Sequence, residues 1–294
     1  MKNNNTIKRE SKVNGFQLIK TLTKPVINGS KTKKFVSGTG EWATQNVNFI
    51  NGCAHDCKYC YAKSMAIRFK RKTIDNWKIE EVDTAKLQLS RKPKEGYTMF
   101  PSSHDISPEN LGYSIELLNQ LLQNGHHVLI VTKPHFTVIE SICERFEDYR
   151  NKILFRFTIG SCNTETLKFW EPFAPSFDER HSSLKHAYSL GFQTSVSCEP
   201  ALDTNTLELA EILLPYITDA MWIGLPNRFK GILKVNGALD SLTLKKAEEL
   251  ISNQSHDWVK TLYNQLHYNP KVKWKDSIKK IMMIDRSVLK GLDV

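Results

Sequence analysis

The chain carries at residues 51–61 the stretch NGCAHDCKYCY, in which three cysteines follow one another with the spacing C-x3-C-x2-C. They are Cys53, Cys57 and Cys60, and the turn signal Asn51-Gly52 stands directly before them. A loop at this point lets three sulfur atoms converge on one face. Because thiolates are soft ligands that suit zinc or iron–sulfur clusters, the stretch predicts a metal centre.

The spacing favours an iron–sulfur cluster over zinc. A structural zinc site takes four closed ligands, usually from two paired motifs, and the sequence has no second pair. His55 could be a fourth ligand, but it lies between two of the cysteines. Three closely spaced thiolates instead fit a [4Fe–4S] cluster with three irons held by protein and the fourth iron open. Zinc and purely structural thiols are the alternatives.

The rest of the composition is that of an intracellular globular protein. Cys143, Cys162 and Cys198 stand alone in apolar surroundings, and we expect each to be a small core residue. The N-terminus MKNNNTIKRESK is basic, but no apolar core follows it, and no apolar run approaches the roughly 20 residues of a spanning helix. The sequence therefore predicts a cytoplasmic protein with reduced thiols and no membrane segment.

Six short runs rich in β-branched or aromatic residues predict strands. They are VNFI at 47–50, YTMF at 97–100, HVLIVT at 127–132, ILFRFTI at 153–159, TSVSCEPAL at 194–202 and AMWIGL at 220–225. Helical patterns lie between or after them, at 110–124, 178–190, 204–214 and 242–266. Strands that alternate with helices predict an α/β fold with a parallel sheet, and six such units suggest a (β/α)6 partial TIM barrel. A full eight-stranded barrel and an open doubly wound sheet are the alternatives.

The chain of 294 residues is expected to fall into three parts. Residues 1–40 predict a basic N-terminal arm, with Lys31, Lys33 and Lys34 near its end. Residues 41–230 predict the barrel, and residues 231–294 a C-terminal helical extension packed on it. In barrels the functional residues lie in the loops that follow the strands, and the cysteine stretch follows the first predicted strand.

The cysteine stretch resembles the radical S-adenosylmethionine (radical SAM) superfamily, since an aromatic residue precedes the last cysteine of C-x3-C-x2-C. The resemblance implies a [4Fe–4S] cluster on Cys53, Cys57 and Cys60, whose open iron binds S-adenosyl-L-methionine. It further implies that one electron cleaves this cofactor to a 5′-deoxyadenosyl radical, which abstracts hydrogen from a substrate. A reducing electron donor such as flavodoxin or ferredoxin is implied as a partner.

Residues 46–225 resemble the spore photoproduct lyase-like branch of that superfamily more closely. The matching segments are Val131-Thr132-Lys133, Arg156-Phe157-Thr158-Ile159, Glu171-Pro172, Ser176-Phe177-Asp178 with Arg180, and Glu199-Pro200. The resemblance implies that Lys133 and Thr158 contact the methionyl carboxylate, together with Ser103 or its neighbour Ser102. It also implies that the backbone at Tyr59 meets the adenine. Arg180 is expected to organise the loop around Glu171.

One departure from that branch concerns the return of hydrogen. In spore photoproduct lyase a cysteine just before the second-strand serine supplies the returning hydrogen atom, whereas this chain reads Phe100-Pro101-Ser102. Thymine-dimer repair is therefore not expected, and the substrate is left open. Tyr61, directly after the last cysteine, is a candidate for hydrogen transfer, with packing or stacking as the alternative.

The net charge of +10 and the pI of about 9.2 favour anionic partners. Behind the cysteines a second basic group follows, with two aromatic residues beside it. Its members are Arg68, Lys70, Arg71 and Lys72, with Phe69 and Trp77. Cations that neutralise phosphates and rings that stack on bases predict nucleic acid as a partner, with a solvated helix face as the alternative. A zinc-dependent nucleic-acid-binding protein without catalysis is the alternative function.

Overall fold

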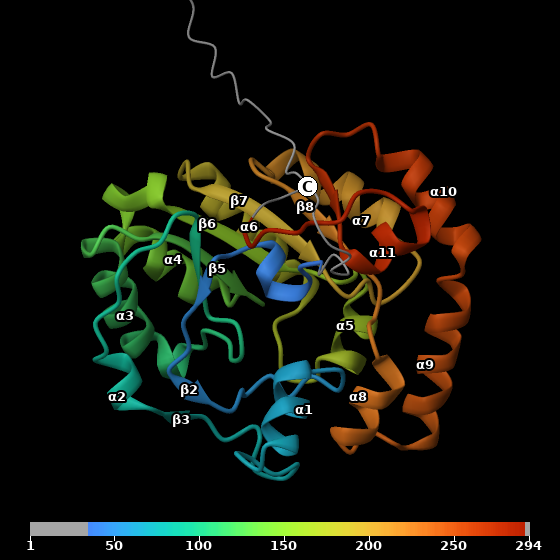
Figure 1. Ribbon diagram of the computed structural model, residues 1–294, viewed down its shortest axis with the longest axis horizontal. Helices are drawn as coiled ribbons and strands as arrows, with labels where there is room; N and C mark the ends of the chain where they lie inside the picture. The colour runs from blue at the N-terminus through green and yellow to red at the C-terminus, as the bar shows by residue number, and fades with distance from the viewer. Residues whose placement is uncertain (1–34, 292–294) are drawn as a thin grey trace, which may run out of the picture. The chain divides into compact units, whose positions relative to one another are not determined.

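The computed structural model describes residues 35–291, whose centre is a seven-stranded sheet with every neighbouring pair parallel (Figure 1). In order across the sheet its strands are β1 (Gln45–Asn46), β4 (Tyr97–Phe100), β5 (His127–Thr132), β6 (Ile153–Thr158), β7 (Gln193–Cys198), β8 (Met221–Ile223) and β9 (Val272–Trp274). The order across the sheet is the order along the chain, without the reversal that marks a doubly wound sheet. The predicted α/β fold with parallel strands is confirmed, and its winding in one direction is that of a partial barrel.

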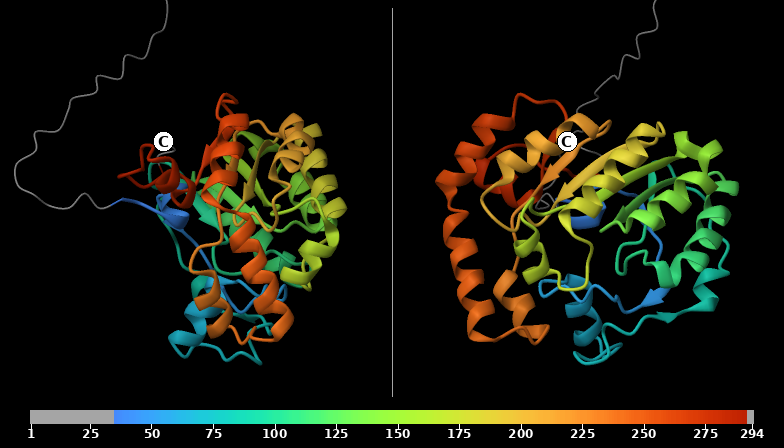
Figure 2. Two further views of the ribbon diagram at one scale, coloured as in Figure 1. Left: turned by 90° about the vertical axis from the view of Figure 1, so that its right-hand side faces the viewer. Right: turned by 180° about the vertical axis from the view of Figure 1, so that it is seen from behind.

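Eleven α-helices surround this sheet in the described part of the chain. They are α1 (Tyr61–Arg68), α2 (Thr84–Leu87), α3 (Leu111–Gln123), α4 (Phe136–Arg145), α5 (Thr164–Trp170), α6 (Phe177–Ser189), α7 (Thr206–Leu213), α8 (Phe229–Val235), α9 (Ser241–Asn253), α10 (His256–Leu266) and α11 (Asp276–Met282). Helices α3, α4, α6 and α7 lie along one face of the sheet (Figure 2). Side-chain oxygens cap several helix starts, as Ser176 does by accepting from the N–H of Glu179 at α6.

The predicted strand at residues 47–50 is wrong. The segment instead bridges β1 and a separate strand, β2 (Ile50–Asn51), which pairs antiparallel with β3 (Glu81–Val82). Val47 and Phe49 are buried in the core outside any ladder, and only Ile50 belongs to a strand, where it pairs with Val82 of β3. Gly52 then turns the chain with φ +109°, and a Cβ there would meet the carbonyl oxygen of Ile79 at 2.3 Å. Only glycine fits this turn, which leads into the cysteine loop, residues 53–60.

The helical stretch predicted at residues 242–266 is divided into two helices, because α9 ends at Asn253 and α10 begins at His256. At the break, Gln254 donates from Nε2 to the backbone oxygens of Ala201 and Asp203, both at 3.0 Å. The segment after residue 230 also supplies β9, which pairs with β8 and was not expected from the sequence. The sheet therefore draws its last strand from a part of the chain whose pattern is helical.

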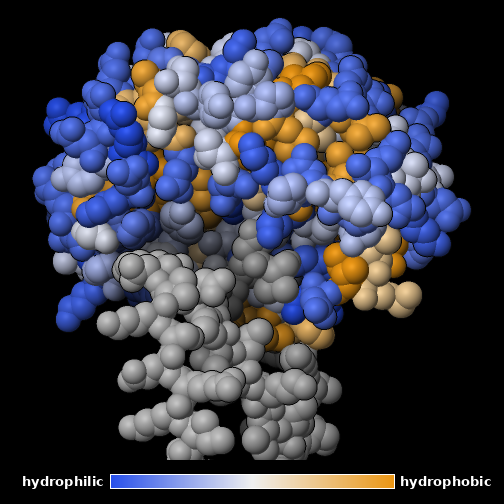
Figure 3. Space-filling model, turned by 90° about the horizontal axis from the view of Figure 1, so that it is seen from above, coloured by the Kyte–Doolittle hydropathy of each residue, from blue (hydrophilic) through white to orange (hydrophobic). Residues whose placement is uncertain are grey.

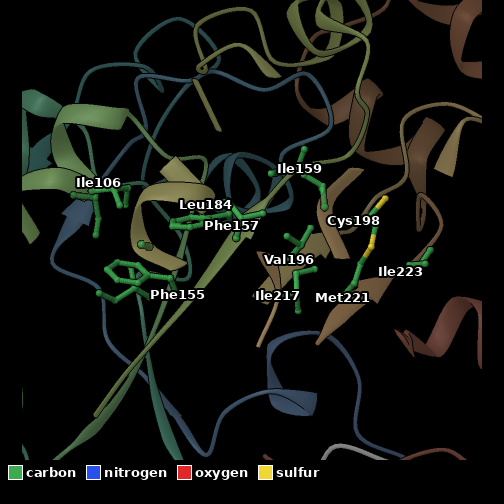
Figure 4. Packing of buried hydrophobic residues seen from close by; sticks show 14 of the residues in the cluster. Ile106, Phe155, Phe157, Ile159, Leu184, Val196, Cys198, Ile217, Met221 and Ile223 are labelled. Atoms are coloured by element: carbon green, nitrogen blue, oxygen red, sulfur yellow. The ribbon is translucent and has the colours of Figure 1, made fainter. Parts of the chain in front are cut away.

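Alternate residues of the strands face two different apolar clusters. In β6, Phe155 and Phe157 belong to the large cluster under the helices, where they lie near Leu184 of α6 (Figure 4). Leu154 faces the other way, into a smaller cluster that includes Trp42 and Trp222. This period of two is the signature of a strand covered on both faces. Burial of each phenylalanine contributes roughly 1.5–3 kcal/mol.

The first and last described segments are hydrogen-bonded to each other. The N–H of Val36 donates to the carbonyl of Ser287, and that of Gly291 to the carbonyl of Gly40, both at 2.8 Å. The face seen from above in Figure 1 mixes hydrophilic residues with scattered apolar patches (Figure 3). Of the predicted basic arm, Lys31, Lys33 and Lys34 lie outside the described residues. Within residues 35–291, no helix is long and apolar enough to cross a membrane.

Candidate active site

A cavity of about 500 Å³ opens where the parallel strands end. Every site residue predicted from the sequence lines it, namely Cys53, Cys57, Tyr59, Cys60, Ser103, Lys133 and Thr158. Lys133 follows β5 directly and Thr158 is the last residue of β6, while Ser103 lies in the loop after β4. The C-terminal ends of neighbouring parallel strands meet at one edge of a sheet, which is why residues so distant in sequence share one cavity.

The three cysteines carry free thiols on a loop that the fold holds at both ends. The N–H of Cys53 donates to the carbonyl of Trp77, and Cys60 is the N-cap of α1, with Sγ 3.4 Å from the N–H of Lys63. Lys63 also reaches back to Asp56 at 2.7 Å. The loop is therefore tied to its own surroundings before any metal binds.

Burial raises the pKa of all three thiols, and Asp105 adds to this effect at Cys53. Lys133 acts in the opposite direction on the pKa of Cys57 and Cys60. Such thiols are uncharged without a metal, and bound iron or zinc supplies the positive charge that deprotonates them. The donor set thus fits a thiolate-bound metal group.

Across residues 35–291, no three Cys, His, Asp or Glu side chains close on one point as ligands of a single metal ion would. The thiolates of a [4Fe–4S] cluster bind three different irons, so they need not share one point. His55, the candidate fourth zinc ligand, is buried, with Nδ1 3.2 Å from Asp105 and Nε2 3.2 Å from His135. Both ring nitrogens therefore face other side chains, and the arrangement fits a cluster better than zinc.

Asp105 joins the loops that follow two neighbouring strands. Its carboxylate accepts from the hydroxyl of Thr132 and, at 3.0 Å, from the N–H of Lys133. Burial alone would raise the pKa of Asp105, but His55, Lys133 and Thr132 outweigh it and hold the pKa below its usual range. The side chain is therefore a buried anion that fixes the backbone at the start of the Lys133 loop.

Lys133 belongs to a second buried network. Its Nζ lies 3.8 Å from Oε1 of Glu171, which also accepts from the hydroxyl of Tyr59. Arg180 contacts Oε2 of Glu171 at 2.5 Å and donates to the carbonyl of Thr158 at 3.0 Å. The predicted role of Arg180 in organising the Glu171 loop is confirmed. Burial would lower the pKa of Lys133, but the carboxylates of Glu171 and Asp105 help to raise it above its usual value, so the amine stays charged.

The two candidate serines differ in what they contact. Asn48 accepts from the N–H groups of both Ser102 and Ser103, at 2.7 and 2.9 Å, and also donates to the hydroxyl of Ser102 at 2.8 Å. The hydroxyl of Ser103 makes no hydrogen bond to the described residues. Tyr61 also lines the cavity, and its hydroxyl donates to the carbonyl of Ser102. Burial raises the pKa of Tyr61 to about 12, so its hydroxyl keeps its proton at neutral pH.

Comparison with known proteins identifies the family. The model of the radical SAM superfamily matches residues 47–214, which hold the cysteine loop and strands β4 to β7. The chain belongs to the radical SAM superfamily. It is also 24% identical over 272 residues to the uncharacterized protein ORF301 of Acidianus two-tailed virus, covering 85% of this chain and 86% of that protein.

Solved structures share the fold of this radical SAM protein at low sequence identity. A mutant of spore photoproduct lyase with dinucleoside spore photoproduct matches with a TM-score of 0.52 and 15% identity, covering 83% of this chain and 79% of that one. Streptococcus suis SuiB bound to S-adenosylmethionine matches with a TM-score of 0.50 and 13% identity. That match covers 84% of this chain and 54% of SuiB. These likenesses show the fold alone.

Behind the cavity wall lies a buried lysine that the sequence did not predict. Lys275, directly after β9, is 1% exposed, with Nζ 2.8 Å from Glu41 and 3.4 Å from Glu199, which lines the cavity. The same Nζ lies 4.0 Å from the ring centroid of Trp42. Burial raises the pKa of Glu199. The sequence did not predict β9, because the strand spans only Val272–Trp274, and so it gave no reason to place Lys275 at the end of a strand.

The basic group after the cysteine loop is only partly available to a partner. Phe69 is 66% exposed, and Arg68, Lys70 and Arg71 are exposed beside it. The predicted roles of two further members are wrong. Lys72 is buried, 2.7 Å from Glu81, and Trp77 is buried against Cys53 in a small cluster under α1. Lys72 instead holds the segment that follows the cysteine loop, and Trp77 packs against the loop itself. Of the isolated cysteines, Cys143 and Cys198 are core residues as expected, while Cys162 is only half-buried.

Proposed function

We propose that this protein holds one [4Fe–4S] cluster on Cys53, Cys57 and Cys60, cleaves S-adenosyl-L-methionine reductively and abstracts hydrogen from a substrate. The observation that carries the proposal is that all seven residues assigned to cluster and cofactor line one cavity of about 500 Å³. When bound, the cluster and its cofactor would supply an electron and a 5′-deoxyadenosyl radical. The chain supplies binding, orientation and exclusion of water.

The proposed roles combine the family resemblance with the position of each side chain in the cavity. The charged amine of Lys133 would pair with the methionyl carboxylate, and the hydroxyls of Thr158 and Ser103 would donate to it. Glu171 and Arg180, both without exposed side-chain surface, fix the position of Lys133 from behind. The backbone at Tyr59 would meet the adenine, and its hydroxyl is held by Glu171.

Anaerobic reconstitution with iron and sulfide tests the proposal. The wild-type chain should gain four irons per protein, and with dithionite and S-adenosyl-L-methionine it should release 5′-deoxyadenosine. The triple variant Cys53→Ala, Cys57→Ala, Cys60→Ala should gain no cluster. Full iron retention in that variant, or zinc as the native metal, would favour the zinc-binding alternative. A cluster without 5′-deoxyadenosine would instead indicate a redox or scaffold protein.

We propose further that the substrate contains nucleic acid. Helix α1 begins at Tyr61 in the cavity wall and ends at Arg68, and the exposed Phe69, Lys70 and Arg71 follow at its other end, about 12 Å along the helix. The net charge of +10 supports an anionic partner. One structural relative was solved with a dinucleoside spore photoproduct, but repair of that lesion through a cysteine is not part of the proposal, because the chain has Pro101 before Ser102. Flavodoxin or ferredoxin is proposed as the electron donor.

A further inference from the structure

Two C-terminal helices contact the cysteine loop from far along the chain. Asn236, which ends α8, is buried, and its Nδ2 donates to the backbone oxygens of Lys58 and Cys60, both at 2.9 Å. These two carbonyls stand on either side of Tyr59. Helices α1 and α8 lie side by side below the sheet in Figure 1. One amide thus spans the last turn of the cysteine loop.

The position of this amide is set by the end of α8. The N–H of Asn236 closes the helix on the carbonyl of Ile232 at 2.9 Å, and Gly237 follows with φ +77°. A residue in that left-handed region ends a helix, and glycine adopts it without steric cost. A primary amide offers two N–H donors on one nitrogen, which matches the two carbonyls. Its Oδ1 is buried without a hydrogen-bond partner within residues 35–291, so the contact with the loop is the amide's main polar interaction.

A second, separate set of contacts holds Lys58. Its Nζ donates to Oγ1 of Thr243 in α9 at 2.9 Å and lies 3.9 Å from the ring centroid of Phe169. Its N–H donates to the carbonyl of Trp170 at 2.9 Å. Helices α5, α8 and α9 therefore all fix the residue directly after Cys57. Nothing in the cysteine stretch itself reveals these contacts, because their partners lie more than a hundred residues away.

We propose that Asn236 is a positioning residue that holds residues 58–60 in the cluster-binding conformation before the cluster arrives. This inference rests on the proposed function, since it assigns the loop a cluster to bind. A site whose ligands are already in place does not have to order its loop on binding. Cys57 is buried and Cys60 half-buried in this conformation, so their reactivity reports whether the loop stays in place.

The matched control lies in the same C-terminal segment. Gln254 is also buried and also donates one amide nitrogen to two backbone carbonyls, those of Ala201 and Asp203, but it does not contact the cysteine loop. Gln254→Ala therefore removes the same kind and number of hydrogen bonds as Asn236→Ala. The difference between the two variants isolates the effect on the loop.

The experiment measures alkylation of cluster-free protein by iodoacetamide, with each cysteine followed by mass spectrometry. Asn236→Ala should raise the rates at Cys57 and Cys60 about tenfold, which corresponds to about 1.4 kcal/mol of loop opening. Asn236→Asp, which puts a carboxylate against two carbonyls, should raise them at least as much. Gln254→Ala should leave both rates at the wild-type value, and Cys198 serves as the internal reference for global unfolding.

A second measurement uses the reconstituted protein. Asn236→Ala should shift the reduction potential of the cluster or the electron paramagnetic resonance signal of its reduced form, whereas Gln254→Ala should leave both unchanged. If Asn236→Ala does not fold, the nearly isosteric Asn236→Asp carries the test. Thr243→Val removes only the hydrogen bond from Nζ of Lys58 and should raise alkylation about threefold. Equal alkylation in wild type and in the Asn236 variants would overturn the inference. Faster alkylation in a chain that takes up no cluster would leave the positioning role standing and refute the proposed function.

Discussion

Lys133 is the residue whose positive charge should bind the carboxylate of S-adenosyl-L-methionine in the cavity. Lys133→Met removes its charge but keeps the length of the side chain. Loss of one charge-assisted hydrogen bond should cost about 1.5–3 kcal/mol of binding, or roughly 10- to 150-fold in affinity for S-adenosyl-L-methionine. Equilibrium dialysis of the reconstituted protein measures this. An intact cluster with unchanged cofactor affinity would show that Lys133 does not bind the carboxylate.

The carboxylate of Glu171 in the same network should make the stability of the fold depend on pH. Burial would raise the pKa of Glu171, but Arg180, Lys133 and Tyr59 hold it below its usual value. A carboxyl whose pKa is lower in the folded state stabilises the fold above the unfolded pKa and loses this contribution as the pH falls through the folded pKa. Glu171→Gln should therefore be less stable than wild type at pH 7 and lose less stability below about pH 4.3. Urea unfolding from about pH 6 to about pH 3 measures both effects.

The sequence predicted residues that line the cavity, but it did not predict which side chains outside the cavity are exposed and which are buried. The three cysteines were predicted from their spacing, and Lys133 and Thr158 from the resemblance to the spore photoproduct lyase-like branch. The pattern around Lys72 and Trp77 predicts exposed side chains equally well, but tertiary contacts with Glu81 and Cys53 bury them. Asn236 could not be predicted, because its two partners lie 178 and 176 residues away.

At the level of elements, a buried ion pair joins Lys275, directly after β9, to Glu41 in the turn before β1. Lys275→Met would leave Glu41 buried without its cation, which typically costs about 3–5 kcal/mol. Lys245→Met in α9 is the control, because that lysine is exposed and its loss should change stability by no more than about 0.5 kcal/mol. Chemical denaturation compares the two variants. Equal stabilities would show that Lys275 and Glu41 do not anchor this edge.

The element predictions succeeded where a strand or helix carries its own pattern. The strand at 127–132 was predicted with its observed bounds, because its run of apolar and β-branched residues ends at a Lys-Pro pair. The strand at 47–50 was misplaced because Val47 and Phe49 fill the core outside any ladder, and only Ile50 has a ladder partner, Val82 of β3. Helices α9 and α10 were merged because the break between them depends on Gln254 and its two partners after β7, which no local pattern contains.

For the molecule as a whole, the charge of +10 should make nucleic-acid binding depend on salt. The variant Arg68→Ser, Lys70→Ser, Arg71→Ser should weaken binding of a single-stranded oligonucleotide. It should also reduce the slope of log affinity against log salt by up to about 0.7 for each phosphate that these side chains neutralise. Fluorescence anisotropy across a salt series measures both the affinity and the slope.

The control variant for this prediction also loses three positive charges, but from lysines that already pair with acidic side chains. Lys230, Lys245 and Lys260 pair with Glu248, Glu249 and Asp257, so replacing these three lysines by Ser should leave the slope nearly unchanged. An equal decrease in both triple variants would indicate a general charge effect. No binding by the wild type even at low salt would make a peptide or small molecule the better substrate class.

The hydrogen bonds between Val36 and Ser287 and between Gly40 and Gly291 join the two ends of the described fold at a seam. A short glycine–serine linker across this seam should therefore permit circular permutation of residues 35–291. New ends could open between Lys94 and Glu95, which lie in an exposed segment outside any helix or strand. Such a permuted chain would bring the last strand of the sheet, β9, ahead of the cysteine loop in the order of synthesis. If this permuted chain still folds, the barrel does not depend on the order in which its strands are synthesised.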